Sequence, residues 1–202
     1  MEHEASASPA AIFTAGLPGA GKTEFTKELL KDITDKPLRI DMDEIACLIS
    51  GYSPKTADRF RAGASIILEK IYDEILKAKL DFVMDGTLSH AKALGNITRA
   101  LEKGYAVKVY FIYQKPEIAW QFTKDRELVE HRSIDRDGFM RTYRNVYENM
   151  ENLQSQDKGV TVSVILKDEN NRVGKQYEDI GDIYAIVPKP LAPDELSRVI
   201  FS

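Results

Sequence analysis

One octapeptide constrains this chain more than any other stretch of its sequence. It reads Gly16-Leu17-Pro18-Gly19-Ala20-Gly21-Lys22-Thr23 and fits the pattern G-x-x-x-x-G-K-[ST] at every position. Glycines let backbone N–H groups turn inward around phosphate oxygens, and the helix that follows such a loop adds the positive end of its dipole. In this arrangement Lys22 reaches the β- and γ-phosphates of a nucleotide, and the Thr23 hydroxyl ligates Mg²⁺. The octapeptide therefore predicts a phosphate-binding loop.

The segments on either side of the octapeptide support this prediction. A phosphate-binding loop requires a buried strand before it and an amphipathic helix after it. Residues 10–15 are a short apolar run without charge, which predicts the strand. In residues 24–33, Phe25, Leu29 and Ile33 recur at spacings of four, which predicts the helix. The alternative is a glycine-rich turn without a ligand, and these flanks favour the phosphate loop.

Composition sets the broad class of the protein. The chain has 202 residues, of which 43% are hydrophobic and 30% charged, and this suits one α/β domain with a well-formed core. A net charge of −4 argues against general affinity for nucleic acids or membranes. The sole cysteine, Cys47, rules out an internal disulfide. We find no apolar run that could span a bilayer and no signal-peptide pattern in residues 1–9, so we expect a cytoplasmic protein.

A second informative stretch is acidic. Residues 38–41 are predicted to form a short strand that leads into Asp41-Met42-Asp43-Glu44. In open parallel sheets, ligands bind beyond the carboxyl ends of the strands, so these carboxylates should face the same crevice as the phosphate loop. Asp43 is our candidate for the base that takes a proton from an attacking hydroxyl. The alternative is that Asp41 and Asp43 only cap a helix over residues 44–49, since aspartate is a favoured N-cap.

A third stretch repeats this pattern of a strand that ends in an acid. After a long helix predicted over residues 55–80, with Ile67, Ile71 and Ile75 at spacings of four, residues 80–87 contain a strand that ends at Asp85. An acid at the end of a buried strand holds Mg²⁺ directly or through water in nucleotide-binding sites, which makes Asp85 the candidate magnesium acid. Thr87 is a candidate substrate or phosphate ligand. Alternatively, Asp85 caps a helix over residues 90–101.

The remaining segments complete an alternating pattern of strands and helices. Residues 106–113 are the most strand-like run and should lie in the middle of the sheet. We expect Trp120 and Phe122 to pack in the core or line a groove. A strand over residues 160–166 and a hairpin formed with residues 173–186 follow, before a short helix over residues 194–200. We therefore expect a flexible tail over residues 1–9, one domain over 10–187 and a C-terminal extension over 188–202.

Arginines gather in one segment near a predicted helix. They are Arg126, Arg132, Arg136, Arg141 and Arg144, with His131 among them. A planar guanidinium donates two hydrogen bonds at once, which suits the oxygens of a transferring phosphoryl group. Such a segment could fold over the nucleotide as a lid, with Arg126 and Arg132 as its candidates. The alternative is ordinary surface ion pairing with the neighbouring acids, and Arg141 and Arg144 fit the solvated face of the next helix.

Four of the segments above, taken in their order along the chain, resemble the zeta toxin family of P-loop kinases. They are the octapeptide, Ile40-Asp41-Met42-Asp43, Phe82-Val83-Met84-Asp85-Gly86-Thr87 and the helix that ends at His131-Arg132. The resemblance covers residues 12–166. It implies a three-layer α/β sandwich with a mostly parallel central sheet, helices on both faces and an arginine-bearing helical lid. It also implies transfer of the γ-phosphoryl group from Mg-ATP to UDP-N-acetylglucosamine or, in wider members, to other nucleotide-sugars or dinucleotides.

The resemblance also implies residue roles and a partner. Asp43 matches the general base, while Lys22 and Thr23 match the phosphate and magnesium residues. Thr87, beside Asp85, matches a substrate-binding position. Arg126 and Arg132 match the two lid arginines, with Arg136 as a possible substitute for one because the spacing is short. A small antitoxin that blocks the nucleotide site is the implied protein partner.

One departure from the family pattern leaves the acceptor open. The family commonly has Glu-Gly-Thr followed two places on by a basic residue, whereas here Asp85-Gly86-Thr87 is followed by Leu88-Ser89-His90. A nucleoside, polynucleotide or NAD-type kinase would use the same phosphate machinery with another acceptor. A GTPase would need Asn/Thr-Lys-x-Asp, which Thr123-Lys124-Asp125-Arg126 misses by one position. A non-catalytic ATP-binding switch would bind nucleotide without turnover.

Overall fold

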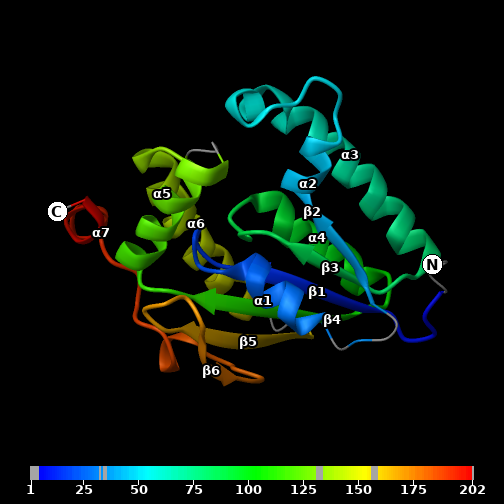
Figure 1. Ribbon diagram of the computed structural model, residues 1–202. Coiled ribbons are helices and arrows are strands. Elements are labelled where there is room, and N and C mark those ends of the chain that lie inside the picture. The colour runs from blue at the N-terminus through cyan, green and yellow to red at the C-terminus, as the bar shows by residue number, and fades with distance from the viewer. Residues whose placement is uncertain (1–4, 32, 34–35, 131–133, 156–158, 202) are drawn as a thin grey trace.

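The sheet has the topology that places a phosphate loop at its centre. A computed structural model describes residues 5–31, 33, 36–130, 134–155 and 159–201. Its strands are β1 Ala10–Ala15, β2 Leu38–Asp41, β3 Phe82–Asp85, β4 Ala106–Tyr113, β5 Val160–Lys167 and β6 Val173–Tyr177. They lie in the order β2-β3-β1-β4-β5-β6 (Figure 1). All neighbouring pairs are parallel except β5 and β6, which form the predicted antiparallel hairpin. The predicted α/β class with a mostly parallel sheet is confirmed.

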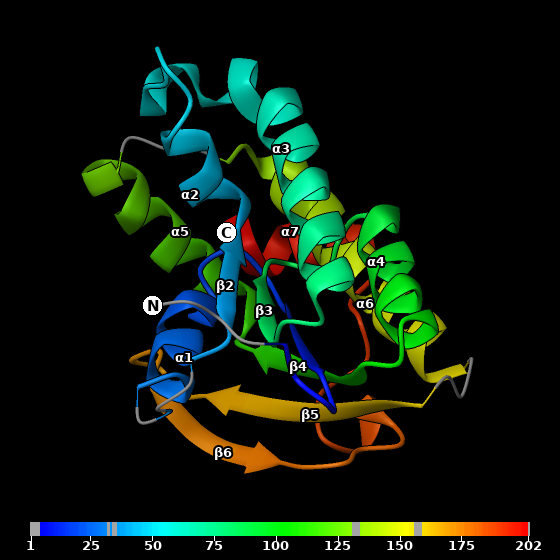
Figure 2. The ribbon, with the colours of Figure 1, turned by 90° about the vertical axis from the view of Figure 1, so that its right-hand side faces the viewer.

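Helices cover both faces of this sheet, as Figure 2 shows. They are α1 Lys22–Leu29, α2 Met42–Cys47, α3 Ala57–Ala78, α4 Ala91–Glu102, α5 Pro116–Glu130, α6 Arg136–Ser155 and α7 Pro193–Phe201, with the 3₁₀ turns η1 Pro54–Thr56 and η2 Ile183–Ala185. Successive residues of a strand point to opposite faces. In β4, Tyr110 packs on Phe25 of α1 and the next residue, Phe111, packs on Tyr147 of α6. The two helices therefore lie on opposite sides of the sheet.

Aromatic side chains join the sheet to α3 and α4. Phe13 of β1 and Phe82 of β3 meet edge to face with centroids 5.7 Å apart, and Tyr72 of α3 packs on Phe82 at 5.4 Å. The Tyr72 hydroxyl donates a 2.6 Å hydrogen bond to the carbonyl oxygen of Asn96 in α4. These contacts fix β3 and the loop after it, where candidate site residues lie.

Two predicted helices differ from the observed ones in their extent or buried face. Helix α1 ends at Leu29, and Ile33 lies beyond it and is 36% exposed. In α3, Ile75 is buried, but Ile67 and Ile71 are each 39% exposed. The helix turns Tyr72 toward the sheet, so the row of isoleucines is rotated partly toward solvent. The spacing identified the helix correctly but not its rotation about its own axis.

The C-terminal residues pack against the same helices that follow β4. Trp120 of α5 contacts Phe139 of α6 and Phe201 of α7, each edge to face with centroids 5.2 Å apart. Leu196 and Ile200 of α7 are buried. Trp120 is thus a packing residue, as expected. Among the helices within the described ranges, none is long and apolar enough to cross a membrane.

Candidate active site

The octapeptide forms a loop between β1 and α1, as predicted. Strand β1 ends at Ala15, and α1 begins at Lys22. Gly19 has φ +77°, and a methyl group at its Cα would lie 2.1 Å from the carbonyl oxygen of Ala119 in α5. No side chain fits there, so glycine allows α5 to pack directly on the loop. Helix α5, which carries Arg126, is therefore in contact with the candidate phosphate site.

Lys22 connects the loop electrostatically to three other segments. Its Nζ donates a 2.6 Å hydrogen bond to the carbonyl oxygen of Leu17 within the loop. Burial lowers the pKa of Lys22 from 10.5 to about 8, Asp85 acts to raise it and Arg126 to lower it, with smaller effects from Glu24 and Asp41. These charges thus lie within electrostatic range of the amine. A desolvated lysine whose hydrogen bond goes to a neutral carbonyl is well suited to bind phosphate.

Asp85 lies at the end of β3 in a cluster built around Arg39. The Asp85 side chain is 3% exposed, and Arg39 donates to its Oδ2 from Nε at 3.1 Å and from Nη2 at 2.8 Å. Arg39 Nη2 also donates to Asp41 Oδ2 at 2.7 Å, and Nη1 donates to Glu44. One guanidinium therefore neutralises acids from the ends of two neighbouring strands. Arg39 was not identified as a site residue from the sequence, although an arginine two residues before Asp41 in a strand must share its face.

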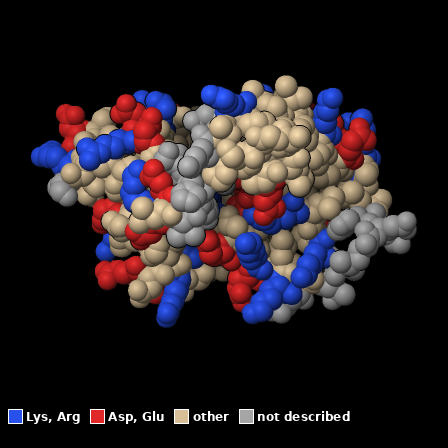
Figure 3. Space-filling view, turned by 45° about the horizontal axis from the view of Figure 1, so that its top comes forward, with Lys and Arg blue, Asp and Glu red and all other residues tan. Residues whose placement is uncertain are grey.

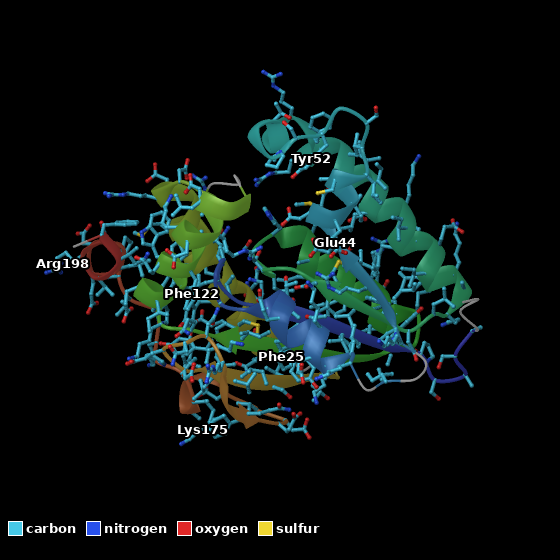
Figure 4. All side chains as sticks on the ribbon, in the orientation of Figure 1. Phe25, Glu44, Tyr52, Phe122, Lys175 and Arg198 are labelled. Atoms are coloured by element: carbon cyan, nitrogen blue, oxygen red, sulfur yellow. The ribbon has the colours of Figure 1, made fainter. Side chains whose placement is uncertain are left out.

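The two acids at the junction of β2 and α2, Asp41 and Asp43, have different positions. Asp41 is the N-cap of α2, because its Oδ1 accepts hydrogen bonds from the backbone N–H groups of Asp43 at 2.8 Å and Glu44 at 3.3 Å. Burial raises the pKa of Asp41. Asp43 is the second residue of the helix, with an exposed side chain. Asp41 therefore fills the capping position, and the role of Asp43 as a base remains a prediction. Glu44 marks this helix start in Figure 4.

The loop after β3 is fastened to both the phosphate loop and α6. The backbone N–H of Gly16 donates to the carbonyl oxygen of Thr87 at 3.2 Å, and the hydroxyls of Thr87 and Ser89 lie 2.7 Å apart. Between them, buried Leu88 has φ +57°, and its carbonyl oxygen accepts a 2.8 Å hydrogen bond from the Asn149 side chain. Thr87 is therefore held beside the octapeptide.

Asp85 does not have the alternative role of capping α4. The N-cap residue of that helix is His90, which makes no capping hydrogen bond through its side chain. Asp85 instead binds Arg39 and accepts a 3.3 Å hydrogen bond from the Thr14 hydroxyl. The candidate magnesium acid is thus held at the sheet rather than by the helix that follows.

The candidate lid arginines have different positions in the structure. Arg126 is exposed on α5 and lies within electrostatic range of Lys22. Arg132 lies outside the described residues. Arg136, its possible substitute, stacks its guanidinium over the Phe201 ring at 4.5 Å. In Figure 3, acidic and basic side chains lie together beside the large tan surface formed around α2 and the start of α3.

The oxygen ligands available suit Mg²⁺ bound together with phosphates. Among the described residues, no group of three or more His, Cys, Asp or Glu side chains could hold a metal ion. Mg²⁺ commonly takes only one or two protein oxygens and completes its shell with water and substrate phosphates. The Thr23 hydroxyl and the Asp85 carboxylate are oxygens of this kind, so the residues present fit that ion.

Comparisons with known proteins relate this geometry to one family. The sequence model described as zeta toxin matches residues 2–178. No curated protein sequence matches the chain. A structure from the PezAT chromosomal toxin–antitoxin system of the human pathogen Streptococcus pneumoniae superposes with a TM-score of 0.69 at 18% identity, covering 99% of this chain and 80% of that one.

Two further structures share the fold. One, from the AvrRxo1-ORF1:AvrRxo1-ORF2 complex with ATP, has a TM-score of 0.63 at 15% sequence identity. The superposition covers 85% of this chain and 57% of the AvrRxo1 chain. The other, from the Pnkp1/Rnl/Hen1 RNA repair complex, has a TM-score of 0.58 at 17% sequence identity. The superposition covers 75% of this chain and 47% of the chain from that complex. At these identities the likeness concerns the fold alone.

Proposed function

This chain belongs to the zeta toxin family, and on that premise we propose that it is an ATP-dependent kinase. It transfers the γ-phosphoryl group to a hydroxyl of a nucleotide-sugar such as UDP-N-acetylglucosamine. The observation that carries the proposal is the electrostatic environment of Lys22. Its amine lies within range of Asp85 and Asp41 at the ends of β3 and β2, and of Arg126 on α5. Phosphoryl transfer requires a cation for the phosphates, acids for magnesium and for the acceptor hydroxyl, and a lid arginine, all close to the transferred group.

The proposed mechanism is in-line transfer with the charges positioned in advance. Asp43 orients the acceptor hydroxyl and takes its proton. Lys22 and the lid arginines Arg126 and Arg132 stabilise negative charge on the transferring group. Thr23 and Asp85 would hold magnesium, which would supply positive charge to the phosphate oxygens.

Arg39 and Thr87 support this chemistry by positioning the groups proposed to react. Arg39 holds Asp85, at the end of β3, next to Asp41, at the end of β2. Asp41 in turn fixes the first turn of α2, which carries Asp43. Thr87 presents a hydroxyl beside the phosphate loop, where an acceptor can be bound. Acceptor and donor would thus meet over Lys22.

Replacement of Asp43 tests the proposed base. Asp43→Asn keeps the size of the side chain but removes its proton affinity, so transfer from ATP to UDP-N-acetylglucosamine should fall about a thousandfold. Affinity for ATP, measured by calorimetry, should stay unchanged. Asp137→Asn is a matched control, because Asp137 is also an exposed acid in the first turn of a helix, α6. Undiminished transfer by Asp43→Asn would contradict the assignment.

Ser89 favours a second candidate acceptor. It is 6% exposed and paired with Thr87, at the position where the resemblance predicts a basic residue. Two hydroxyls that hydrogen-bond to each other suit an uncharged part of an acceptor, as in a nucleoside or the sugar at the end of a polynucleotide. Phosphate transfer to such an acceptor would keep the mechanism and change the substrate.

The toxin–antitoxin context belongs to the proposal as well. The PezAT structure comes from a toxin–antitoxin system. We extend this to the present chain as the expectation that a small antitoxin protein binds it and blocks the nucleotide site. Copurification of such a partner with loss of ATP binding would support this.

A further inference from the structure

Lys167, the last residue of β5, is a partly buried cation that forms no ion pair with any residue that the structure describes. Among the described residues, its ammonium makes neither a hydrogen bond nor an ion pair. Burial lowers the pKa of Lys167, and the nearby acids Glu24 and Asp168 only partly offset this effect. An amine held away from water without an acceptor costs free energy unless a ligand supplies one. This arrangement favours a bound anion.

The Lys167 ammonium lies directly against the phosphate loop. A methyl group on Gly21 would lie 3.0 Å from Lys167 Nζ and 3.1 Å from Asn171 Nδ2. Gly21 has φ +78° and immediately precedes Lys22, the first residue of α1. Absence of a side chain at Gly21 therefore lets a second lysine approach the site where Lys22 is expected to bind phosphates.

Hydrogen bonds from the turn between β5 and β6 fix this approach. The Asn171 side chain donates to the carbonyl oxygen of Gly19 at 3.0 Å, which joins the turn to the phosphate loop. Gln114 is 2% exposed, and its side chain donates to the carbonyl oxygen of Asp168 at 2.7 Å. The turn that begins directly after Lys167 is thus anchored to the phosphate loop and to Gln114.

The order of the strands shows which part of a nucleotide Lys167 would meet. The loop after β1 lies centrally, with Asp85 and Asp41 on the β3 and β2 side and Lys167 on the β5 side. If the γ-phosphate points to the acids, where the acceptor hydroxyl must be, the α-phosphate and nucleoside lie toward β5. The start of α1, between Gly21 and Glu24, is then beside the α-phosphate.

From this placement we infer that Lys167 binds the α-phosphate of the nucleoside triphosphate donor, with Asn171 and Gln114 as its positioning residues. The inference rests on the proposed phosphotransfer function. It adds a donor-binding contact on the β5 side of the loop, opposite the acceptor. In the bound state, the α-phosphate oxygen supplies the acceptor that the amine lacks in the free protein.

Thio-substituted nucleotides test this contact. The two diastereomers of adenosine 5′-(α-thio)triphosphate place sulfur, a poor hydrogen-bond acceptor, at one or the other nonbridging position of the α-phosphate. The wild-type protein should therefore bind them unequally. In Lys167→Met the affinity for ATP should fall about tenfold, and the ratio between diastereomers should move toward one. A lysine that acted only through its long-range charge would weaken both equally and leave the ratio unchanged.

Lys175→Met is the matched control. Lys175 lies on β6 of the same hairpin, is exposed, and stands at the outer edge of the sheet in Figure 4. It should alter neither ATP affinity nor the diastereomer ratio. The Lys167→Met variant should fold, because it loses only a partly desolvated charge. Thermal unfolding of the variant tests this expectation.

The outcomes separate this inference from the proposed function. ATP binding by the wild type with an unchanged diastereomer ratio in Lys167→Met would overturn the Lys167 contact alone. Absence of ATP binding by the wild type would overturn both.

Discussion

Arg39 is the residue on which the arrangement of acids depends most. It contacts Asp85 and Asp41, and its own side chain is only 15% exposed. Removing one partner of a buried ion pair leaves the other charge without compensation, which typically costs several kcal/mol. We expect Arg39→Met to lower the free energy of unfolding by about 3 kcal/mol in urea titrations.

An exposed arginine provides the control for Arg39. Arg144 lies 3.6 Å from Glu148, and these side chains are 62% and 57% exposed. Arg144→Met should change the free energy of unfolding by less than about 1 kcal/mol. Equal, small effects of both variants would show that Arg39 does not hold the acid cluster together.

Lys22 gives nucleotide binding a defined pH dependence. Its pKa is about 8 in the free protein, and a bound phosphate must raise it because the anion favours the charged amine. Binding therefore takes up a proton above pH 8, and ATP affinity should fall by up to about tenfold per pH unit there. Calorimetry from about pH 7 to about pH 9.5 should show a plateau and then this decline. The Lys22→Met variant should not show this decline in ATP affinity. A decline of the same size in that variant would mean that another group causes the pH dependence.

At the scale of elements, the contact between α5 and the phosphate loop is the tightest constraint. Gly19→Ala would bring a methyl group to 2.1 Å from the carbonyl oxygen of Ala119, at φ +77°. We expect it to lower the free energy of unfolding by at least about 2 kcal/mol and to weaken ATP binding. Urea titration and calorimetry measure the two effects, and a variant as stable as the wild type would contradict the observed packing.

Gly95→Ala is the contrasting substitution. Gly95 is exposed within α4, and nothing lies within 4 Å of a methyl group at its Cα. Alanine is the better helix former, so this variant should raise the free energy of unfolding by about 1 kcal/mol. ATP binding should be unchanged.

Elements with a strong local signal were predictable from the sequence. Strands β1, β2 and β4 begin and end where the sequence predicted, because proline, glycine or a charged residue lies at or near the ends of each. The rotation of α3 was not predictable, since Tyr72 turns inward to meet Phe82, a partner that periodicity cannot identify. Tertiary packing decides which of several apolar stripes is buried.

At the scale of the whole molecule, the strand order brings together segments far apart in sequence. The octapeptide and the acids at the ends of β2 and β3 were found from sequence because each lies at the carboxyl end of a strand, and parallel strands end at one edge. The cluster around Arg39 and the approach of Lys167 to Gly21 were not found. Both depend on side-chain distances between strands, and such distances follow only from the folded sheet.

Phosphotransfer to a small hydroxyl-bearing acceptor is the activity that we propose for this protein. The most direct measurement incubates the purified chain with Mg-ATP and a panel of UDP-sugars, nucleosides and NAD, and uses mass spectrometry to find any acceptor that has gained one phosphate. We predict a phosphorylated UDP-amino-sugar, formed by the wild type and lost in Asp43→Asn. Tight ATP binding without phosphorylation of any acceptor would contradict the account and leave a nucleotide-binding protein that is not a kinase.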